Sequence, residues 1–266
     1  MTSPARTKRR TRSPGWVPDQ HGAWAMITIP ALSGVVLAGW EWVHLPLLLF
    51  WWVGYFAFQA GALWLKSRRR PRYLPPLRTY ALIAAPFGLA VLLLRPQLAL
   101  WAPLFAPLIA IAVWAAMARR ERGLLNDTAT VLAAALMVPV TFSAAAPLDD
   151  ARWPWVLVVT GIEFAYFWGT IPHVKALIRE RDNPAYHWFS AIYHNVGAAI
   201  VVGAAALGSL TTTPLGGWFL AVTWVGLGVR AAWMPAHQHQ TGPMRPIVIG
   251  MTEVVFSLLV AFGLLA

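Results

Sequence analysis

The segment Gly161–Asn195 reads GIEFAYFWGTIPHVKALIRERDNPAYHWFSAIYHN. It leaves one apolar run, passes through the charged cluster Arg179–Asp182, and enters a second apolar run. The first run carries a carboxylate, Glu163, and the second carries a histidine, His194. An ionisable side chain at the centre of a membrane span costs about 2.5–3.5 kcal/mol, so such residues usually face other helices or a polar cavity. The segment therefore predicts two membrane-spanning helices with polar groups turned inward.

The composition of the whole chain is that of a membrane protein. Of its 266 residues, 58% are hydrophobic and 12% are charged, whereas about a quarter of the residues of a soluble domain are charged. The 16 tryptophans suit the interface between lipid and water. The absence of cysteine excludes disulfides, thiolate metal sites and a cysteine nucleophile.

Nine stretches are apolar and long enough to cross a bilayer as helices, which takes about 20 residues. They are Ala23–Trp40, Leu45–Leu65, Thr79–Leu94, Leu98–Met117, Asp127–Ala146, Trp153–Pro172, Trp188–Ser209, Pro214–Val229 and Pro246–Ala266. The predicted fold is an all-α transmembrane bundle of about nine spans. It forms one domain, residues 18–266, after a basic, disordered tail at residues 1–17. A cleavable signal peptide is the alternative for the N-terminus, but polar residues 18–21 precede the apolar run and no clear cleavage site follows.

The formal net charge of +11 is distributed over short loops rather than over a surface suited to nucleic acid. With nine spans, the N-terminal tail and alternate loops hold all of the 21 Lys and Arg residues except Arg95 and Arg152. By the positive-inside rule, this places the N-terminus in the cytoplasm and the C-terminus outside. We therefore expect the lipid bilayer as a partner, with anionic headgroups near the basic loops, and no nucleic acid.

The ionisable groups inside the spans, together with polar residues near them, are the candidate site residues. The candidate catalytic groups are Glu163, Asp127, Glu253 and His194. The candidate ligand-binding residues are His21, Asn126, His173, Lys175, Arg179, Glu180, Arg181, Asn183 and Tyr193. In this topology they lie near the cytoplasmic face, except Glu163, which is deepest and would form the floor of a cavity. Helix N-termini at that face favour an anion such as a phosphate or a carboxylate.

Several candidates also have a purely structural interpretation. Glu163 would then be a protonated carboxyl that hydrogen-bonds a neighbouring helix, and Asp127 would be the N-cap of the fifth span. The charged residues 179–182 would be a self-paired surface loop. Arg230 directly follows the eighth span, so we expect it in the cytoplasmic mouth, outside that helix. No histidine pair has the i, i+4 spacing of a helical zinc site, so histidine ligation of a metal or haem is a minor alternative. The sequence predicts no metal site and leaves any cofactor unknown.

Five segments resemble the YwiC-like family of bacterial membrane proteins. They are PDQHGAWAM (Pro18–Met26), ERGLLND (Glu121–Asp127), YFWGTIPHVKALIRERDNP (Tyr166–Pro184), YHN (Tyr193–Asn195) and RPIVIGMTE (Arg245–Glu253). The resemblance covers nearly the whole chain after the tail. It implies an integral protein of the bacterial cell membrane and no particular reaction.

A more distant similarity is to UbiA-type prenyltransferases, which also have nine spans and an N-terminus in the cytoplasm. That family binds a prenyl diphosphate through magnesium held by aspartate-rich cytoplasmic loops. The related loops here, Arg120–Asp127 and Arg179–Asn183, lack the paired DxxD spacing. The loop between the second and third spans has no carboxylate at all, so the similarity does not extend to a magnesium–diphosphate site.

The leading hypothesis is a membrane-embedded enzyme or binding protein for an amphipathic anion, with an isoprenoid phosphate as the first guess. Lys175, Arg179 and Arg181 would bind the anion, and the three candidate carboxylates would act as acid, base or cation ligands. One alternative is a proton-coupled transporter in which Glu163 and His194 relay protons. Another is an assembly factor without a ligand. Enzymatic and non-enzymatic functions both stay open, and the sequence sets no oligomeric state.

Overall fold

The computed structural model describes residues 15–17 and 21–266. Every regular element within these residues is a helix. The α-helices are α1 (His21–Ala38), α2 (His44–Lys66), α3 (Leu74–Leu94), α4 (Ala102–Met117), α5 (Leu124–Ala135), α6 (Met137–Ala145), α7 (Trp153–Ile178), α8 (Pro184–Ala206), α9 (Pro214–Thr241) and α10 (Pro246–Leu265). Two short 3-10 helices, η1 (Pro71–Tyr73) and η2 (Pro96–Trp101), precede α3 and α4. Most of the predicted tail and residues 18–20 lie outside the described residues, so the prediction of a disordered tail stays a prediction.

Eight helical segments of the described chain are long and apolar enough to cross a membrane. The helix α1, with 18 residues, is a ninth apolar helix. This confirms the predicted all-α bundle of about nine spans. One of the eight segments, Leu124–Ala145, consists of α5 and α6 and is interrupted at Leu136. Pro139 explains the break, because it has no N–H to donate to the carbonyl of Ala135 and its ring crowds that carbonyl.

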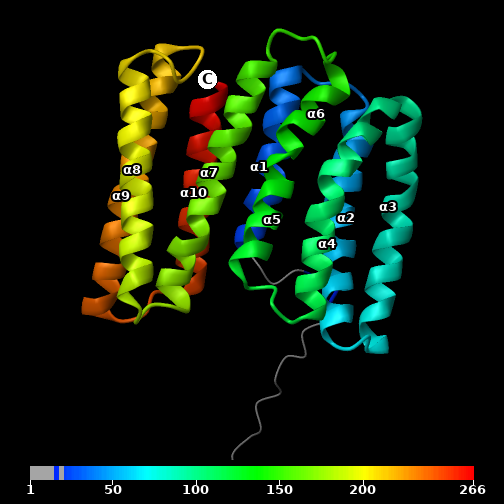
Figure 1. The fold of residues 1–266 in the computed structure, drawn as a ribbon, viewed down its shortest axis with the longest axis horizontal. Helices are drawn as coiled ribbons and strands as arrows, with labels where there is room; N and C mark the ends of the chain where they lie inside the picture. Colours follow the sequence, from blue (N-terminus) through cyan, green and yellow to red (C-terminus); the bar gives the residue numbers. More distant parts are fainter. Residues whose placement is uncertain (1–14, 18–20) are drawn as a thin grey trace, which may run out of the picture.

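The helices run up and down, and their connections alternate between the two ends of the bundle (Figure 1). The α2–α3, α4–α5, α7–α8 and α9–α10 connections lie at the lower end in that view, and the arginine-rich segments fall there. Arg95 and Arg152 belong to the opposite end. There Arg95 contacts Glu41 at 2.6 Å, and Arg152 contacts the carboxylate of Asp150 at 2.7 Å. By the positive-inside rule, we expect the lower, basic end to face the cytoplasm.

The helix α1 lies in the middle of the bundle and packs against α5, α6, α7 and α10. The hairpins α2–α3 and α8–α9 flank this central group on opposite sides (Figure 1). Gly34 allows the close approach of α1 to α6, because a Cβ there would lie 2.1 Å from both the carbonyl oxygen of Val138 and Oγ1 of Thr141. Thr141 Oγ1 also donates to the carbonyl of Ala31 on α1, at 2.9 Å. The first half of α6 is therefore packed closely against α1.

Large apolar side chains cover the outside of the bundle. Leu82 and Leu93 on the peripheral helix α3 are each 75% exposed, for example. Such a surface is expected where hydrocarbon tails, rather than water, surround the helices. The buried ionisable side chains of the described residues lie inside this apolar shell and are His44, Glu163, Tyr166, His173, His194, Arg230 and Glu253.

Candidate functional site

A cavity of about 560 Å³ lies between α1, α2, α4, α5, α7 and α10. Its lining at the basic end includes Arg122 and Arg179, and its inner part is lined by Tyr166 and Glu253. Arg179 and Tyr166 are 13 positions apart along α7, which corresponds to about 20 Å of helix. The cavity therefore extends from the basic end well into the bundle.

Two ion pairs hold the mouth of this cavity together. Lys175 Nζ lies 2.6 Å from Asp127 Oδ2 and also donates to the backbone carbonyl of Arg122, at 3.1 Å. Lys66 Nζ lies 3.1 Å from Glu121 Oε1. The first pair joins α7 to the first turn of α5, and the second joins the end of α2 to the α4–α5 connection. Residues from distant parts of the sequence thus meet around one opening.

The predicted N-cap role of Asp127 is wrong. The helix α5 begins at Leu124, after Gly123 in an extended conformation (φ −74°, ψ 147°), so Asp127 lies within the first turn. A carboxylate in that turn is favoured by the helix dipole. Here its oxygen also faces Lys175, so Asp127 connects two helices instead of capping one.

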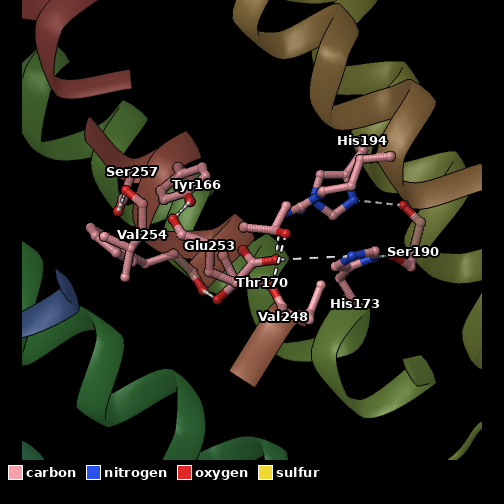
Figure 2. A network of polar contacts seen from close by, with 12 residues as sticks. Tyr166, Thr170, His173, Ser190, His194, Val248, Glu253, Val254 and Ser257 are labelled. Carbon is pink, nitrogen blue, oxygen red and sulfur yellow. Dashed lines mark hydrogen bonds and ion pairs between the residues drawn. The ribbon is translucent and has the colours of Figure 1, made fainter. Parts of the chain in front are cut away.

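A second group of candidates forms a buried cluster around Glu253 (Figure 2). Arg230 Nη1 donates to the carboxylate of Glu253, and Arg230 Nη2 lies 3.4 Å from Nε2 of His194. His194 Nδ1 is 2.8 Å from the carbonyl of Ser190, which it can reach only as a donor, so Nε2 presents its lone pair to Arg230. His173 Nδ1 lies 3.3 Å from Ser190 Oγ, and its Nε2 lies 3.9 Å from Glu253 Oε1.

This cluster is deeply buried, with no member among Arg230, Glu253, His173 and His194 more than 6% exposed. Three of its polar atoms, Glu253 Oε2, His173 Nε2 and Arg230 Nε, make no hydrogen bond within the described residues. A buried polar atom without a hydrogen bond costs about 1–3 kcal/mol. The cluster therefore has hydrogen-bonding capacity that the described side chains do not use.

Glu253 belongs to both groups of candidates. It lines the cavity on one side and pairs with Arg230 on the other. Tyr166, which also lines the cavity, donates its hydroxyl to the backbone carbonyl of Glu253 at 2.9 Å. The fold thus connects the cavity to the buried cluster through one carboxylate.

The prediction that Arg230 lies beyond the end of the eighth span is wrong. The helix α9 continues through Thr241, so Arg230 lies within the helix and is 5% exposed. No glycine follows Arg230 before Gly242, and Pro235 is accommodated inside the helix. The available sequence signal was an arginine that no glycine follows before Gly242, with a carboxylate, Glu253, in the next span to balance it. The sequence analysis also did not identify Ser190, which contacts both His173 and His194.

Glu163 lies apart from the cavity. It is 1% exposed, and its Oε1 accepts a hydrogen bond of 2.5 Å from Ser33 Oγ on α1. The lining of the cavity on α7 ends at Tyr166, about one helical turn short of Glu163. The observed contact is the one that the structural interpretation of Glu163 requires, and Glu163 does not form the floor of this cavity.

The candidates on the α7–α8 connection mainly stabilise the connection itself. Asn183 caps α8, because its side-chain oxygen accepts from the N–H of Ala185 at 3.1 Å. Its Nδ2 donates to Glu180 Oε2 at 3.2 Å. Arg181 is exposed, contacts Asp182 at 3.4 Å, and does not line the cavity.

Of the remaining candidates, Asn126 lines the cavity, Tyr193 joins α8 to α7, and His21 begins α1. Asn126 lines the cavity and donates to the backbone carbonyl of Glu121 at 2.8 Å. Tyr193 donates to the carbonyl of Ala165 at 2.8 Å. His21 is the first residue of α1, and its side chain lies outside the described residues. In the part of the chain that the structure describes, no group of three or more His, Asp or Glu residues could hold a metal ion.

Comparison with known proteins places the chain in a family. Residues 17–142 match the sequence model of a family described as "YwiC-like protein". A Bacillus subtilis protein, "Uncharacterized protein YwiC", is 34% identical over 182 residues, which cover 67% of this chain and 73% of that protein. The chain belongs to the YwiC-like family. A Haemophilus influenzae relative, "Uncharacterized protein", is 28% identical over 243 residues, which cover 91% of this chain and 96% of that protein. No solved structure matches the chain.

In this YwiC-like protein, four of the segments that carry the resemblance meet at the cavity. Pro18–Met26 contributes Ala23, Ala25 and Met26 on α1. Glu121–Asp127 forms part of its mouth, Tyr166–Pro184 supplies the α7 wall, and Arg245–Glu253 supplies the α10 wall. The chain is thus a multi-pass membrane protein of the YwiC-like family whose family-like segments are close together in space. The comparisons do not support the similarity to UbiA-type prenyltransferases.

Proposed function

We propose that this YwiC-like protein binds the charged head of an amphipathic anion in the cavity, at the cytoplasmic face of the bacterial cell membrane. An isoprenoid phosphate is the first candidate, because it combines a phosphate with an apolar chain. The observation that carries the proposal is the lining of the cavity, which is cationic at the mouth and largely apolar along the walls.

The charges at the mouth favour an anion. Lys66 and Lys175 are balanced by the carboxylates that they contact. Arg122 and Arg179 line the same mouth and make no ion pair within the described residues. About two positive charges are therefore available to a ligand. Arginine suits a phosphate in particular, because its planar guanidinium can donate two parallel hydrogen bonds to phosphate oxygens.

The walls suit a hydrocarbon chain. Phe58, Leu63, Ile171 and Val174 line the cavity between the mouth and its inner part. The volume of about 560 Å³ falls within the range of roughly 300–1,000 Å³ that is usual for small-molecule sites. A headgroup at the mouth with its chain along α7 would use both kinds of lining.

Glu253 is the strongest candidate for acid or base chemistry on such a ligand. Among the carboxylates that line the cavity it lies farthest from the mouth, and its Oε2 makes no hydrogen bond within the described residues. His173 lies behind it, with Nε2 3.9 Å from Glu253 Oε1, and is the nearest group that could exchange a proton with it. Asp127 would instead hold Lys175 in place at the mouth, and Glu163 would stabilise the contact of α7 with α1.

The two alternatives have less support. A transporter needs a polar path to the opposite end, yet beyond Glu163 the buried side of α7 continues with Val159 and Val156, which are fully buried and apolar. An assembly factor without a ligand would have no need for unbalanced arginines around an internal cavity. The experiment that follows separates the second alternative from ligand binding.

Native mass spectrometry of the detergent-purified protein tests the proposal. The unaltered protein should retain an isoprenoid phosphate, and the Arg122→Gln/Arg179→Gln variant should lose it. Arg120→Gln/Arg181→Gln is the matched control, because it removes the same charge from the same two connections at residues outside the cavity. A protein without any retained ligand, or equal retention in both variants, would contradict the proposal.

A further inference from the structure

A second depression, of about 600 Å³, lies at the basic end of the bundle, between the ends of α2 and α4 and the helix η1. Its polar lining residues are Lys66, Ser67, Arg68, Arg70, Tyr73 and Arg119. The lining contains four cations and no carboxylate. Leu63 and Lys66 also line the larger cavity, so the two hollows are neighbours.

The charges in this depression are poorly balanced. Lys66 is paired with Glu121 at 3.1 Å. Arg68, Arg70 and Arg119 make no ion pair within the described residues. The C-terminal ends of α2 and α4 also point here, but each contributes only about half a negative charge. The net charge stays positive, so the three arginines repel one another unless an anion lies between them.

The backbone at two of these arginines is unusual. Arg68 has a φ of +59° and Arg119 has a φ of +56°, in the left-handed region that side chains other than Asn and Asp seldom adopt. At both helix ends the next residue donates its N–H to the carbonyl five positions earlier, at 2.8 Å and 2.7 Å. This is the Schellman motif, in which the left-handed position is usually glycine. Two helix ends thus carry arginine where glycine would fit better, and both side chains line the same depression.

We propose that this depression is a binding site for a phosphate group, supplied by the headgroup of an anionic membrane phospholipid. The site lies where α2 and α4 end, which is the level of the headgroups if these helices span the bilayer. Arg68 and Arg119 would contact the phosphate from the two helix ends, with Arg70 on the η1 side. The three arginines proposed here do not line the larger cavity, so the proposal does not depend on the cavity ligand.

A pair of neighbouring glycine substitutions tests the site. Arg68→Gly removes a lining cation and should weaken binding of phosphatidylglycerol about fivefold, since a basic residue near a membrane surface contributes roughly 1 kcal/mol. Arg69→Gly is the matched control. Arg69 has the same backbone conformation (φ +61°) and charge, but it lies over the ring of Trp64 and does not line the depression. Glycine adopts this conformation without strain, so both variants should fold.

Binding is measured by native mass spectrometry and by lipid titration in nanodiscs, with Arg119→Gly as a second site variant and inorganic phosphate as competitor. Lipid binding that is weakened by Arg68→Gly and Arg119→Gly, and survives excess phosphate, supports the proposed headgroup. If inorganic phosphate displaces the lipid and binds with the same dependence, the site is supported with a soluble phosphate as ligand. Equal binding by all three glycine variants and the unaltered protein would overturn it. Arg122→Gln/Arg179→Gln should keep this lipid, which separates a failure of this site from a failure of the cavity.

Discussion

Arg230 on α9 and Glu253 on α10 form an ion pair inside the bundle, and both side chains are at least 92% buried. Each charge is tolerated there because the other balances it. Glu253 also lines the cavity, so the pair fixes the position of the carboxylate that a ligand would meet. We therefore expect the pair to affect both stability and the proposed ligand binding.

Removing one member of this pair should be far more harmful than removing both. Arg230→Met leaves the carboxylate without its counter-charge, and we expect a loss of about 3–5 kcal/mol in the free energy of unfolding. Arg230→Met/Glu253→Leu should lie within about 1 kcal/mol of the unaltered protein, because an apolar pair can replace a buried ion pair. Unfolding in mixed detergent micelles measures both values. A double variant at least as unstable as Arg230→Met would show that the pairing is not what stabilises these side chains.

Glu163 and Glu253 should respond differently to the same substitution. Glu163→Gln keeps an acceptor for Ser33 Oγ, so we expect unchanged ligand retention and a change in stability within about 1 kcal/mol. Glu253→Gln removes the charge that balances Arg230 and alters the cavity lining, so ligand retention should fall. Native mass spectrometry and unfolding of both variants check this. If a stable Glu163→Gln variant lost the ligand, Glu163 would take part in ligand binding, contrary to this prediction.

Gly34 should tolerate no side chain. Gly34→Ala places a methyl group 2.1 Å from the carbonyl oxygen of Val138, and forcing α1 and α6 apart should cost about 1–3 kcal/mol or more. Gly203→Ala is the control, because nothing lies within 4 Å of the added atom on α8, and alanine there should be neutral or stabilising by up to about 1 kcal/mol. Thermal unfolding in detergent compares the two. Equal stability of both variants would mean that the helices can separate at little cost.

The turn before α7 should depend on the ionisation of Asp150. The side chain and the backbone N–H of Arg152 both donate to this carboxylate and hold its pKa at about 2, below the ordinary value of 3.8. Since the pKa is lower in the folded protein, the contribution to stability is full above about pH 4 and is lost as the pH falls through 2.

Asp150→Asn should therefore lower the unfolding temperature near neutral pH, and the difference from the unaltered protein should shrink between about pH 4 and pH 2. Asp149→Asn is the control, because the neighbouring Asp149 makes no side-chain hydrogen bond within the described residues. A difference that does not vary with pH would mean that the charge of Asp150 is not involved.

The span count could be predicted from the sequence because it depends on the length of apolar runs and on where the basic residues fall. Both are properties of single segments. The meeting of Asp127 and Lys175 could not be predicted in the same way. Their position at the same end followed from the topology, but their contact depends on α5 packing beside α7, which the sequence pattern of either helix leaves open.

The errors at Arg230 and Glu163 have one common cause. A charged residue in an apolar run suggests either a helix end or a polar cavity, and the choice depends on its partner. Arg230 remains inside α9 because Glu253 on the next helix balances it. Glu163 has the predicted depth, but its neighbour is Ser33 on α1 rather than the cavity. In both cases the deciding partner lies on another helix.

The two halves of the span that is broken at Leu136 make different contacts. Below it, α5 carries Asn126 and Asp127 on the cavity wall, and above it, α6 is held against α1 at Gly34. Because Pro139 leaves the carbonyl of Ala135 without its helical hydrogen bond, bending at this point breaks fewer bonds than bending elsewhere in the span. We therefore expect any bending of this span to occur at Leu136, where it would move the cavity wall on α5 relative to the part of the span that is packed against α1.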